Sequence, residues 1–224
     1  NNGSGTATIT NAAAGSYTVS VIDANNCFAQ ATVVISQPAA LSTTLSGVEP
    51  LCHGSSNGQL SIGVNGGTGT YTYEWNNGAT GAFVTGVAAG SYLVTVTDAN
   101  NCSVTAGSVL NQPAALAITS TANQPLCSGD HNGNIQLSAQ GGTGTYSYNW
   151  SNGQTGSTIS GLSGGSYTAT VTDANSCTVI QSFNLNNPAA LAPMATVTDA
   201  LCYGEANGSI ALNVSGGTPG YSYN

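Results

Sequence analysis

Cysteine is the residue type in this chain whose chemistry and spacing are most informative. Six cysteines form two interleaved series that share one 75-residue period: Cys27, Cys102 and Cys177 in one, and Cys52, Cys127 and Cys202 in the other. An even number of cysteines at fixed spacing is typical of the disulfides of exported proteins. The repeat contains no Cys-x-x-Cys pair, so it does not predict a zinc site.

The two histidines do not recur with this period. The position of His53 holds Ser128 one period later, and the position of His131 holds Ser56 one period earlier. Chemistry built into a repeated module should recur with the module. The pair Asp130-His131 is therefore interpreted as two polar loop residues and not as part of a nucleophile system. We predict no catalytic residue, no cofactor and no enzyme activity.

Three aspartates do recur with the period, Asp23, Asp98 and Asp173. Each is a weak candidate for binding calcium together with Asn side chains or backbone carbonyls. Calcium takes six to eight oxygen ligands, and one carboxylate per turn supplies few of them. The preferred interpretation is an Asp that closes a hairpin turn through hydrogen bonds to its own backbone, so no metal site is predicted.

The composition excludes several classes of partner. The chain has 224 residues, no Lys or Arg, eight acidic residues and a net charge of -8. Without cationic side chains it cannot neutralise phosphates, which excludes nucleic acids and anionic membrane surfaces. With 40% hydrophobic residues the chain should fold. No apolar run approaches the roughly 18 residues of a membrane span, so we expect no direct membrane insertion.

The period extends over the whole chain without a gap. The segment 66–73, Gly-Gly-Thr-Gly-Thr-Tyr-Thr-Tyr, recurs with one change at 141–148 and in related form at 216–223. The chain is one residue short of three full periods, and it begins just after the position held by Trp75 and Trp150. We therefore expect both ends to fall inside a unit, as in a piece of a longer protein.

Within a unit the hydrophobic pattern is that of β-strands. Leu60, Ile62 and Val64 alternate with other residue types, and the same phase returns at 135–139 and 210–214. Period two indicates half-buried strands. Turn signals separate them: Asp-Ala-Asn stretches and the Asn-Gly pairs at 57–58, 77–78, 132–133 and 152–153, where Asn and Gly accept positive φ or cap the backbone. The pattern predicts a sandwich of antiparallel sheets.

Proline-containing joints divide the chain at 37–41, 112–116 and 187–191. Proline fixes φ and withdraws a backbone donor, which suits a short stiff joint between strands. On this phasing, residues 41–112 and 116–187 are complete domains, residues 1–37 are the C-terminal half of one domain, and residues 191–224 are the N-terminal half of another. Each half-domain should expose an unpaired core unless a neighbouring molecule or further sequence completes it.

Three disulfide pairings respect the period. Bonds within a domain would join Cys52 to Cys102 and Cys127 to Cys177. Bonds across a joint would join Cys27 to Cys52. A bond between neighbouring domains would join Cys52 to Cys177 and leave the other four cysteines to partners outside the chain. In a sandwich of immunoglobulin order, Cys52 and Cys102 lie at opposite poles, roughly 23 Å apart for a seven-residue strand. A disulfide spans only about 7 Å between Cα atoms, so Cys52 with Cys177 is favoured, with the others open.

The aromatic residues are interpreted as packing residues. Trp75 and Trp150 are in phase with inward tyrosines, which favours a core position over a sugar-stacking platform. Tyr92 follows a Gly-Ser pair and opens a strand, and Tyr17 and Tyr167 hold the same place in their units. This place fits a tyrosine corner, in which the hydroxyl bonds nearby backbone.

The order of these motifs resembles the SprB-type repeat. The residues that carry the resemblance are Cys52-His53-Gly54, Asn57-Gly58, Gly66-Gly67-Thr68-Gly69, Tyr71–Trp75, Gly90-Ser91-Tyr92 and Val94–Cys102. The usual Gly of the family before the second cysteine is here Asn101, Asn26 or Ser176.

The resemblance implies tandem immunoglobulin-like β-sandwich repeats that form a rod or filament in a giant gliding adhesin of Bacteroidota. It also implies export by the type IX route and a secreted or cell-surface location, in an outer-membrane-associated filament. The expected partners are neighbouring repeats of the same long chain.

Two classes of function follow. The first is a structural stalk that extends and transmits force between the cell surface and an adhesive tip. The alternative is a repetitive array that binds carbohydrate or another surface by avidity. A hydroxyl-rich, uncharged surface can adhere to polysaccharide, so composition does not choose between them. Exposed aromatics that recur in every repeat would favour the array, whereas buried aromatics and linked junctions would favour the stalk.

Because trypsin cleaves after Lys and Arg, we predict that pure trypsin leaves this chain intact even when it is unfolded in urea. Mass spectrometry after incubation checks this, with a denatured Lys-containing protein as the control for protease activity. Any tryptic fragment would show that the sequence is misread.

Overall fold

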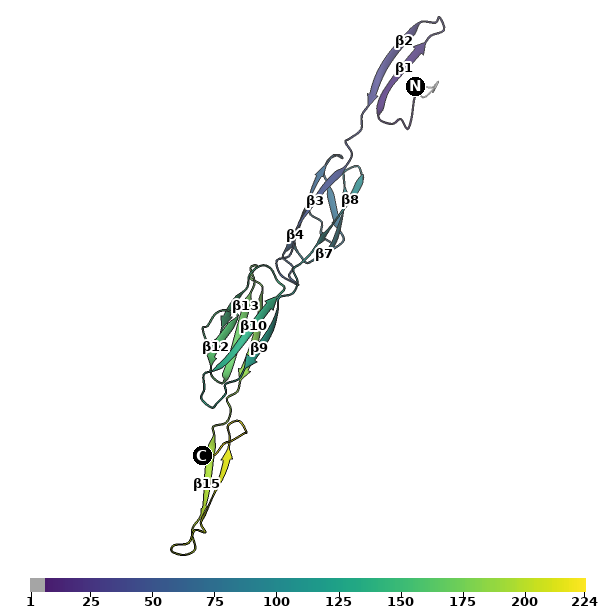
Figure 1. The fold of residues 1–224 in the computed structure, drawn as a ribbon. Helices are drawn as coiled ribbons and strands as arrows, with labels where there is room; N and C mark the ends of the chain where they lie inside the picture. The colour runs from purple at the N-terminus through teal and green to yellow at the C-terminus, as the bar shows by residue number, and fades with distance from the viewer. Residues whose placement is uncertain (1–6) are drawn as a thin grey trace. The chain divides into compact units, whose positions relative to one another are not determined.

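The structure is a computed structural model that describes residues 7–224; residues 1–6 of the expected half-domain 1–37 lie outside this range. Every regular element between residues 7 and 224 is a β-strand (Figure 1). The described residues include no helix that is long and apolar enough to cross a membrane. The chain divides into two units, one holding Gln59–Leu110 with the segment up to Val48, and one holding Glu49–Gly58 with Asn111–Asn224.

The first sandwich has six strands in two sheets. They are β3 (Ser42–Val48), β4 (Gly58–Asn65), β5 (Thr72–Trp75), β6 (Phe83–Val87), β7 (Gly90–Thr97) and β8 (Ser103–Leu110). One sheet has the order β3-β4-β6 and the other β5-β7-β8. The first, second and fourth strands thus share one sheet, and the third, fifth and sixth share the other. This is the immunoglobulin arrangement of strands.

The second sandwich repeats this topology. Its strands are β9 (Ala117–Asn123), β10 (Gly133–Gln140), β11 (Ser147–Trp150), β12 (Thr158–Leu162), β13 (Gly165–Thr172) and β14 (Thr178–Leu185). They form sheets of order β12-β10-β9 and β11-β13-β14, with antiparallel pairing. The prediction of tandem, all-β, immunoglobulin-like antiparallel sandwiches is confirmed.

Two hairpins flank the sandwiches in the sequence. β1 (Gly15–Ile22) pairs with β2 (Phe28–Ile35), and β15 (Ala192–Thr198) pairs with β16 (Ser209–Ser215). By the repeat period, β1 and β2 correspond to β7 and β8, whereas β15 and β16 correspond to β3 and β4. Each hairpin forms a two-stranded sheet.

The period-two pattern places one face of each strand in the core. Leu60, Val94 and Val96 have no exposed surface, whereas Leu93, next to Val94 on the same strand, is 51% exposed. Trp75 and Trp150 are 2% and 5% exposed, and their indole N–H groups donate to the carbonyls of Gly81 at 2.9 Å and Gly156 at 3.0 Å. Both tryptophans are therefore core residues with their polar atom satisfied.

The three corresponding tyrosines are half-buried. Tyr92 and Tyr167 pack against the two cores, and each hydroxyl donates to a carbonyl four residues upstream, on Ala88 at 2.8 Å and Ser163 at 3.0 Å. Tyr17 makes the same bond to Ala13 at 2.8 Å. Each of these residues therefore forms a tyrosine corner. None is a fully buried core aromatic, because its hydroxyl reaches a backbone carbonyl at the edge of the repeat.

The Asn-Gly pairs have two different roles. Gly78 and Gly153 have positive φ in tight turns, in which their N–H groups donate to the carbonyls of Trp75 and Trp150. By contrast, Gly58 and Gly133 begin strands β4 and β10 and are buried. The composition of the pairs alone does not distinguish the two roles. In the pairs that end in Gly58 and Gly133, the Asn side chain makes the structural contact, as described below.

The joints are fixed to the Gly-Gly motif that follows them. The N–H groups of Gly67, Gly142 and Gly217 donate to the carbonyls of Ala39, Ala114 and Ala189 at 2.8 to 2.9 Å. Gly66 has a φ of 77°, and a Cβ there would lie 2.1 Å from the carbonyl oxygen of Ala40. Glycine is required because the chain of the joint passes too close for a side chain.

We predict that Leu60→Ala destabilises the first sandwich by about 2–5 kcal/mol, because the cavity lies in a closed core. Leu93→Ala on the exposed face of β7 is the control and should change stability by less than about 0.5 kcal/mol. Urea denaturation followed by tryptophan fluorescence measures both. Each core holds one tryptophan, so L60A should shift the unfolding midpoint of only the Trp75 part of the fluorescence signal to a lower urea concentration. Equal effects of the two substitutions would contradict the assigned core.

Candidate functional site: a disulfide between a loop and a hairpin turn

The loop that carries Cys52 runs between β3 and β4 and is called here the Cys52 loop (residues 49–57). Its own side chains shape it. Asn57 Oδ1 accepts the N–H of Leu51 at 3.0 Å, and Ser55 Oγ accepts the N–H of Cys52 at 3.2 Å. Asn132 and Asn207 accept the equivalent N–H groups of Leu126 and Leu201, both at 3.0 Å. The Asn of these Asn-Gly pairs therefore closes a loop instead of forming a hairpin turn.

The turn that carries Cys177 joins β13 to β14. Asp173 Oδ1 accepts the N–H groups of Asn175 and Cys177, both at 2.9 Å. Ser176 has a φ of 66°, and its counterparts Asn26 and Asn101 have 66° and 64°. This is the left-handed region that favours glycine, so the turn keeps the conformation of a family glycine although the residue differs.

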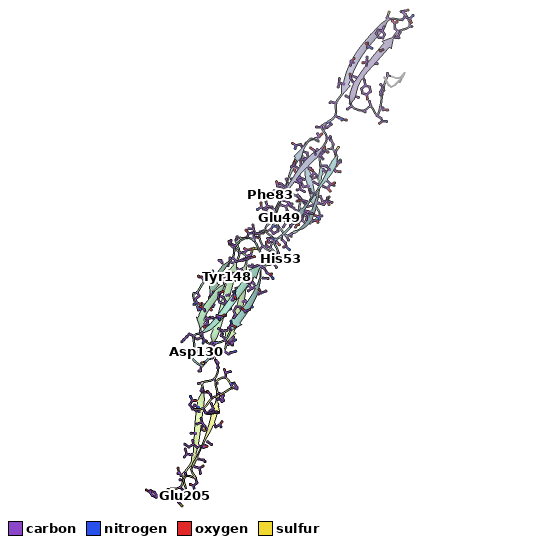
Figure 2. The ribbon with its side chains drawn as sticks, viewed as in Figure 1. Glu49, His53, Phe83, Asp130, Tyr148 and Glu205 are labelled. Atoms are coloured by element: carbon purple, nitrogen blue, oxygen red, sulfur yellow. A yellow bond between two sulfur atoms is a disulfide. The ribbon has the colours of Figure 1, made fainter. Side chains whose placement is uncertain are left out.

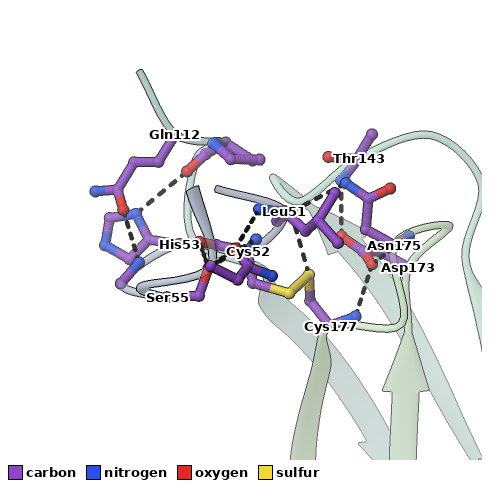
Figure 3. Close-up of a disulfide and its surroundings, with 12 residues drawn as sticks. Leu51, Cys52, His53, Ser55, Gln112, Thr143, Asp173, Asn175 and Cys177 are labelled. Atoms are coloured by element: carbon purple, nitrogen blue, oxygen red, sulfur yellow. Dashed lines mark hydrogen bonds between the residues drawn. A yellow bond between two sulfur atoms is a disulfide. The ribbon is translucent and has the colours of Figure 1, made fainter. Parts of the chain in front are cut away.

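The structure places Cys52 and Cys177 in a disulfide, the pairing favoured from the sequence (Figure 3). Their Cα atoms are 5.8 Å apart, although their sequence separation is 125. Beside the bond, Asn175 Nδ2 donates to the carbonyl of Leu51 at 3.0 Å. Leu51 is 49% exposed, whereas Leu126 and Leu201, in loops without a disulfide, are 72% and 83% exposed.

The far side of the Cys52 loop is held by the joint. Gly54 N–H donates to Gln112 Oε1 at 2.7 Å, and His53 Nδ1 lies 3.2 Å from the carbonyl oxygen of Pro113. At the start of the loop, Glu49 Oε1 accepts the side chain and backbone N–H of Asn111 at 3.0 and 3.3 Å. The loop is thus fastened to Asn111–Pro113 as well as to the hairpin turn.

These contacts explain why the Cys52 loop belongs to the second unit. Glu49–Gly58 groups with Asn111–Asn224 and not with the strands on either side of it in sequence. The second unit therefore contains a loop contributed by the preceding repeat. Sequence reasoning missed the roles of His53, Gln112 and Asn175, because each bonds a residue that is distant in sequence or an unpatterned backbone atom.

The aspartate of the turn also binds a second segment. Asp98 Oδ2 accepts the N–H of Thr68 at 2.9 Å while its Oδ1 accepts the N–H groups of Asn100 and Cys102 at 2.9 and 2.8 Å. Asp173 repeats this with Thr143 at 2.8 Å. Both aspartates are 5% exposed. The carboxylate joins the hairpin turn to the Gly-Gly-Thr loop that precedes it in the same repeat.

These donors lower the pKa of each carboxyl. The backbone N–H of Cys102, helped by Thr68 and Asn100, keeps the pKa of Asp98 below its ordinary 3.8 against the raising effect of burial. For Asp173, burial is the largest influence and raises the pKa, but the combined donors from Cys177, Thr143 and Asn175 outweigh it. The N–H groups of Cys27 and Asn25 lower the pKa of Asp23.

The carboxylates that were candidates for calcium therefore accept hydrogen bonds from backbone N–H groups. Asp23, like the other two, accepts the N–H of its cysteine, Cys27, at 2.8 Å. The hydrogen bonds are those of the preferred interpretation, an Asp that closes its hairpin. Among residues 7–224 no group of three or more His, Cys, Asp or Glu residues is placed to hold a metal ion.

The other cysteines are exposed thiols. Cys27 and Cys102 follow hairpin turns, as Cys177 does, and Cys127 and Cys202 lie in loops equivalent to the Cys52 loop. The structure thus contains two hairpin thiols and two loop thiols, the two kinds of cysteine that meet in the Cys52–Cys177 bond.

The Asp130-His131 pair does not form a nucleophile system. Asp130 Oδ2 accepts the N–H of Cys127 at 3.2 Å and Asn132 Nδ2 at 2.9 Å, whereas His131 Nδ1 lies 2.5 Å from Ser163 Oγ. The carboxylate thus caps its loop as Ser55 does in the Cys52 loop and does not orient the imidazole. Asp130 and Glu205 hold the same place in successive repeats (Figure 2), and Glu205 Oε2 accepts Asn207 Nδ2 at 3.2 Å.

Fold and site define a class of tandem immunoglobulin-like repeat proteins in which a disulfide links a loop of one repeat to a hairpin of the next. The family model of the SprB repeat matches residues 44–80, 119–155 and 194–224, segments that recur with the period of the cysteines. The chain is an array of SprB-type repeats, which confirms the resemblance seen in the sequence. The family and the disulfide fit a repetitive extracellular or cell-surface protein.

Solved structures offer only distant likeness. The structure titled surface layer protein SbsC, domains 1-6, is 15% identical, with 92% of this chain and 45% of that chain covered and a TM-score of 0.34. The complex of Dpr2 Ig1-Ig2 with DIP-Theta Ig1-Ig3 gives 14% identity, 73% and 70% coverage and a TM-score of 0.29. Scores this low carry no argument about function. No curated protein matches the chain.

We predict that Asp98→Asn destabilises the first sandwich at neutral pH, because an amide nitrogen in place of Oδ2 cannot accept the N–H of Thr68. The pKa of Asp98 is lower in the folded chain than its ordinary 3.8. Its stabilising effect is therefore complete above about pH 3.8 and is lost as the pH falls through the lowered pKa.

Urea midpoints at pH 7 and pH 2.5 test this. The difference between the original chain and D98N should be present at pH 7 and should shrink at pH 2.5. Asp199→Asn, at an exposed position in the loop between β15 and β16, is the control and should show no difference at pH 7. An equal loss for D98N at both pH values would contradict the role of the charged carboxylate.

Proposed function

We propose that this chain is a stalk segment of a long extracellular adhesin filament, which extends and transmits force between the cell surface and an adhesive tip. In this proposal the filament is an exported, outer-membrane-associated structure of a gliding cell, and it has no enzyme activity. The observation that carries the proposal is the Cys52–Cys177 disulfide, which joins two successive repeats covalently.

The bond changes the path that tension takes along the chain. A pull on the segments outside Cys52 and Cys177 passes from one sulfur to the other and bypasses the residues between them. These residues include strands β4 to β8 of the first sandwich and β9 to β13 of the second. A repeat array with such bonds resists extension, because most of each core lies outside the loaded path.

The hydrogen bonds around the disulfide support the same role. Gln112, Pro113 and Asn175 bind the Cys52 loop from the joint and from the hairpin turn. These contacts hold the loop in place on both sides of the sulfur, so the loop does not depend on a single flexible tether.

The distribution of exposed aromatic residues argues against the carbohydrate-binding array. The tryptophans that recur are buried. The exposed aromatics Phe28, Phe83 and Tyr203 do not recur, since their positions in the other repeats hold Ser, Thr or His. Tyr223 is also exposed and does recur, but its counterparts Tyr73 and Tyr148 pack against the two cores. Avidity requires the same binding group in every repeat, and these residues supply no such aromatic group.

Single-molecule pulling of the oxidised chain by its ends tests the stalk. We predict that the disulfide keeps the chain between Cys52 and Cys177, a sequence separation of 125, from being extended. At about 3.6 Å per extended residue, the reduced chain should lengthen by about 450 Å more than the oxidised chain. The double variant Cys52→Ser with Cys177→Ser is the matched control and should extend fully without reductant.

Two results would overturn the proposal. One is an oxidised chain that extends as far as the double serine variant, which would mean that the bond does not carry load. The other is saturable binding of the oxidised chain to polysaccharide at a site present in every repeat, which would favour the binding array.

A further inference from the structure

The inner face of the β1–β2 hairpin is an uncovered sandwich face. Val19 and Val21 on β1 are 52% and 61% exposed, whereas Val94 and Val96, their counterparts on β7, are fully buried. An open groove of about 720 Å³ lies on this face and is lined mainly by apolar side chains, among them Ile9, Val19 and Val21. β1 therefore exposes to solvent the side chains that its counterpart β7 buries in the complete sandwich.

The β15–β16 hairpin presents the complementary face. Ile210 and Leu212 on β16 are 75% and 48% exposed. Their counterparts are buried in both complete sandwiches, as Leu60 and Ile62 on β4 and as Ile135 and Leu137 on β10.

The complete sandwiches show what covers each face. In the first core, Leu60 and Ile62 of β4 pack in one cluster with Val94 and Val96 of β7. In the second core, Ile135 of β10 lies in one cluster with Val171 of β13. The faces of β1 and β16 are thus the two halves of this same packing.

We propose that the inner face of β1–β2 is a binding surface for the β15–β16 hairpin of a second copy of this chain, and that the two halves together complete one immunoglobulin-like sandwich. The proposal is independent of the stalk function. Both faces are exposed in the described residues, so each is open to another molecule.

The strand edges fit this occupant as well as the faces do. Within residues 7–224, β1 pairs with β2 alone, whereas its counterpart β13 has β11 on its other edge. By the register of Tyr73 with Val96, Tyr223 of the second copy would lie opposite Val21. By the register of Ile135 with Ile159, Ile210 of the second copy would lie opposite Ile9.

Each copy carries one hairpin of each kind, so the contact is heterologous: it joins different faces of the two copies and leaves one face of each kind for further copies. The expected product is a head-to-tail series. In both complete sandwiches the position that follows Glu74 or Asn149 holds a core tryptophan, Trp75 or Trp150. A tryptophan appended after Asn224 would take this position in the shared sandwich, so it should strengthen the association.

The test is the mass of the chain in solution over a range of concentrations, by analytical ultracentrifugation. All forms carry serine at Cys27, Cys102, Cys127 and Cys202, which excludes oligomers linked by disulfides and keeps the Cys52–Cys177 bond. The chain should form a series of oligomers that grows with concentration, and the appended tryptophan should shift this series to at least tenfold lower concentration. A monomer at all concentrations in both forms would overturn the proposal.

Two charge substitutions separate the faces. Val21→Asp disables the β1–β2 face and Ile210→Asp disables the β15–β16 face, and neither residue lies in a complete core. Each variant alone should be monomeric, because every contact needs one face of each kind. Mixed together, they should give a 1:1 dimer and nothing larger.

Ser16→Asp, on the opposite face of β1 and outside the groove, is the matched control and should assemble as the unsubstituted chain does. Continued self-association of V21D or I210D alone would show a general apolar attraction and overturn the proposal. The absence of a dimer in the mixture would overturn it as well, provided that tryptophan fluorescence shows both complete sandwiches folded.

Discussion

The disulfide between Cys52 and Cys177 is the constraint on which the organisation of this chain depends. It closes a path of 125 residues and draws a loop of one repeat into the unit built by the next. Hydrogen bonds hold each partner of the bond in place. Ser55 and Asn57 shape the loop, and Asp173 orients the backbone of the hairpin cysteine.

The aspartate of the hairpin turn links the local structure to this bond. One oxygen of Asp173 fixes the turn that carries Cys177, and the other binds the Gly-Gly-Thr loop at Thr143. That loop in turn holds the joint through Gly142 and Ala114. A single buried carboxylate therefore connects the joint, the loop and the cysteine, which explains why an acidic residue recurs in a chain with few charges.

Particular residues show how far sequence reasoning reached in this site. The sequence favours the Cys52–Cys177 pairing, because immunoglobulin strand order would put Cys52 and Cys102 farther apart than a disulfide reaches, and it leaves the other pairings open. The hairpin role of the aspartates is preferred because one carboxylate per turn supplies few of the oxygens that calcium takes. The contacts of His53 with Pro113, and of Asn175 with Leu51, had no sequence signal, because a backbone carbonyl at a distance of 60 or 124 residues leaves no pattern. The two kinds of Asn-Gly pair also looked alike in the sequence.

The sequence by itself determined the repeat period, the alternation that makes strands, the inward position of the tryptophans and the absence of any cationic site. These properties are local, since they follow from residue type and from a spacing of two. Only the tertiary structure established how far each tyrosine is buried, which cysteines form a disulfide and which repeat the Cys52 loop packs against. Those outcomes depend on distances between segments far apart in the chain, and such distances exist only once the two sheets of each sandwich have packed together.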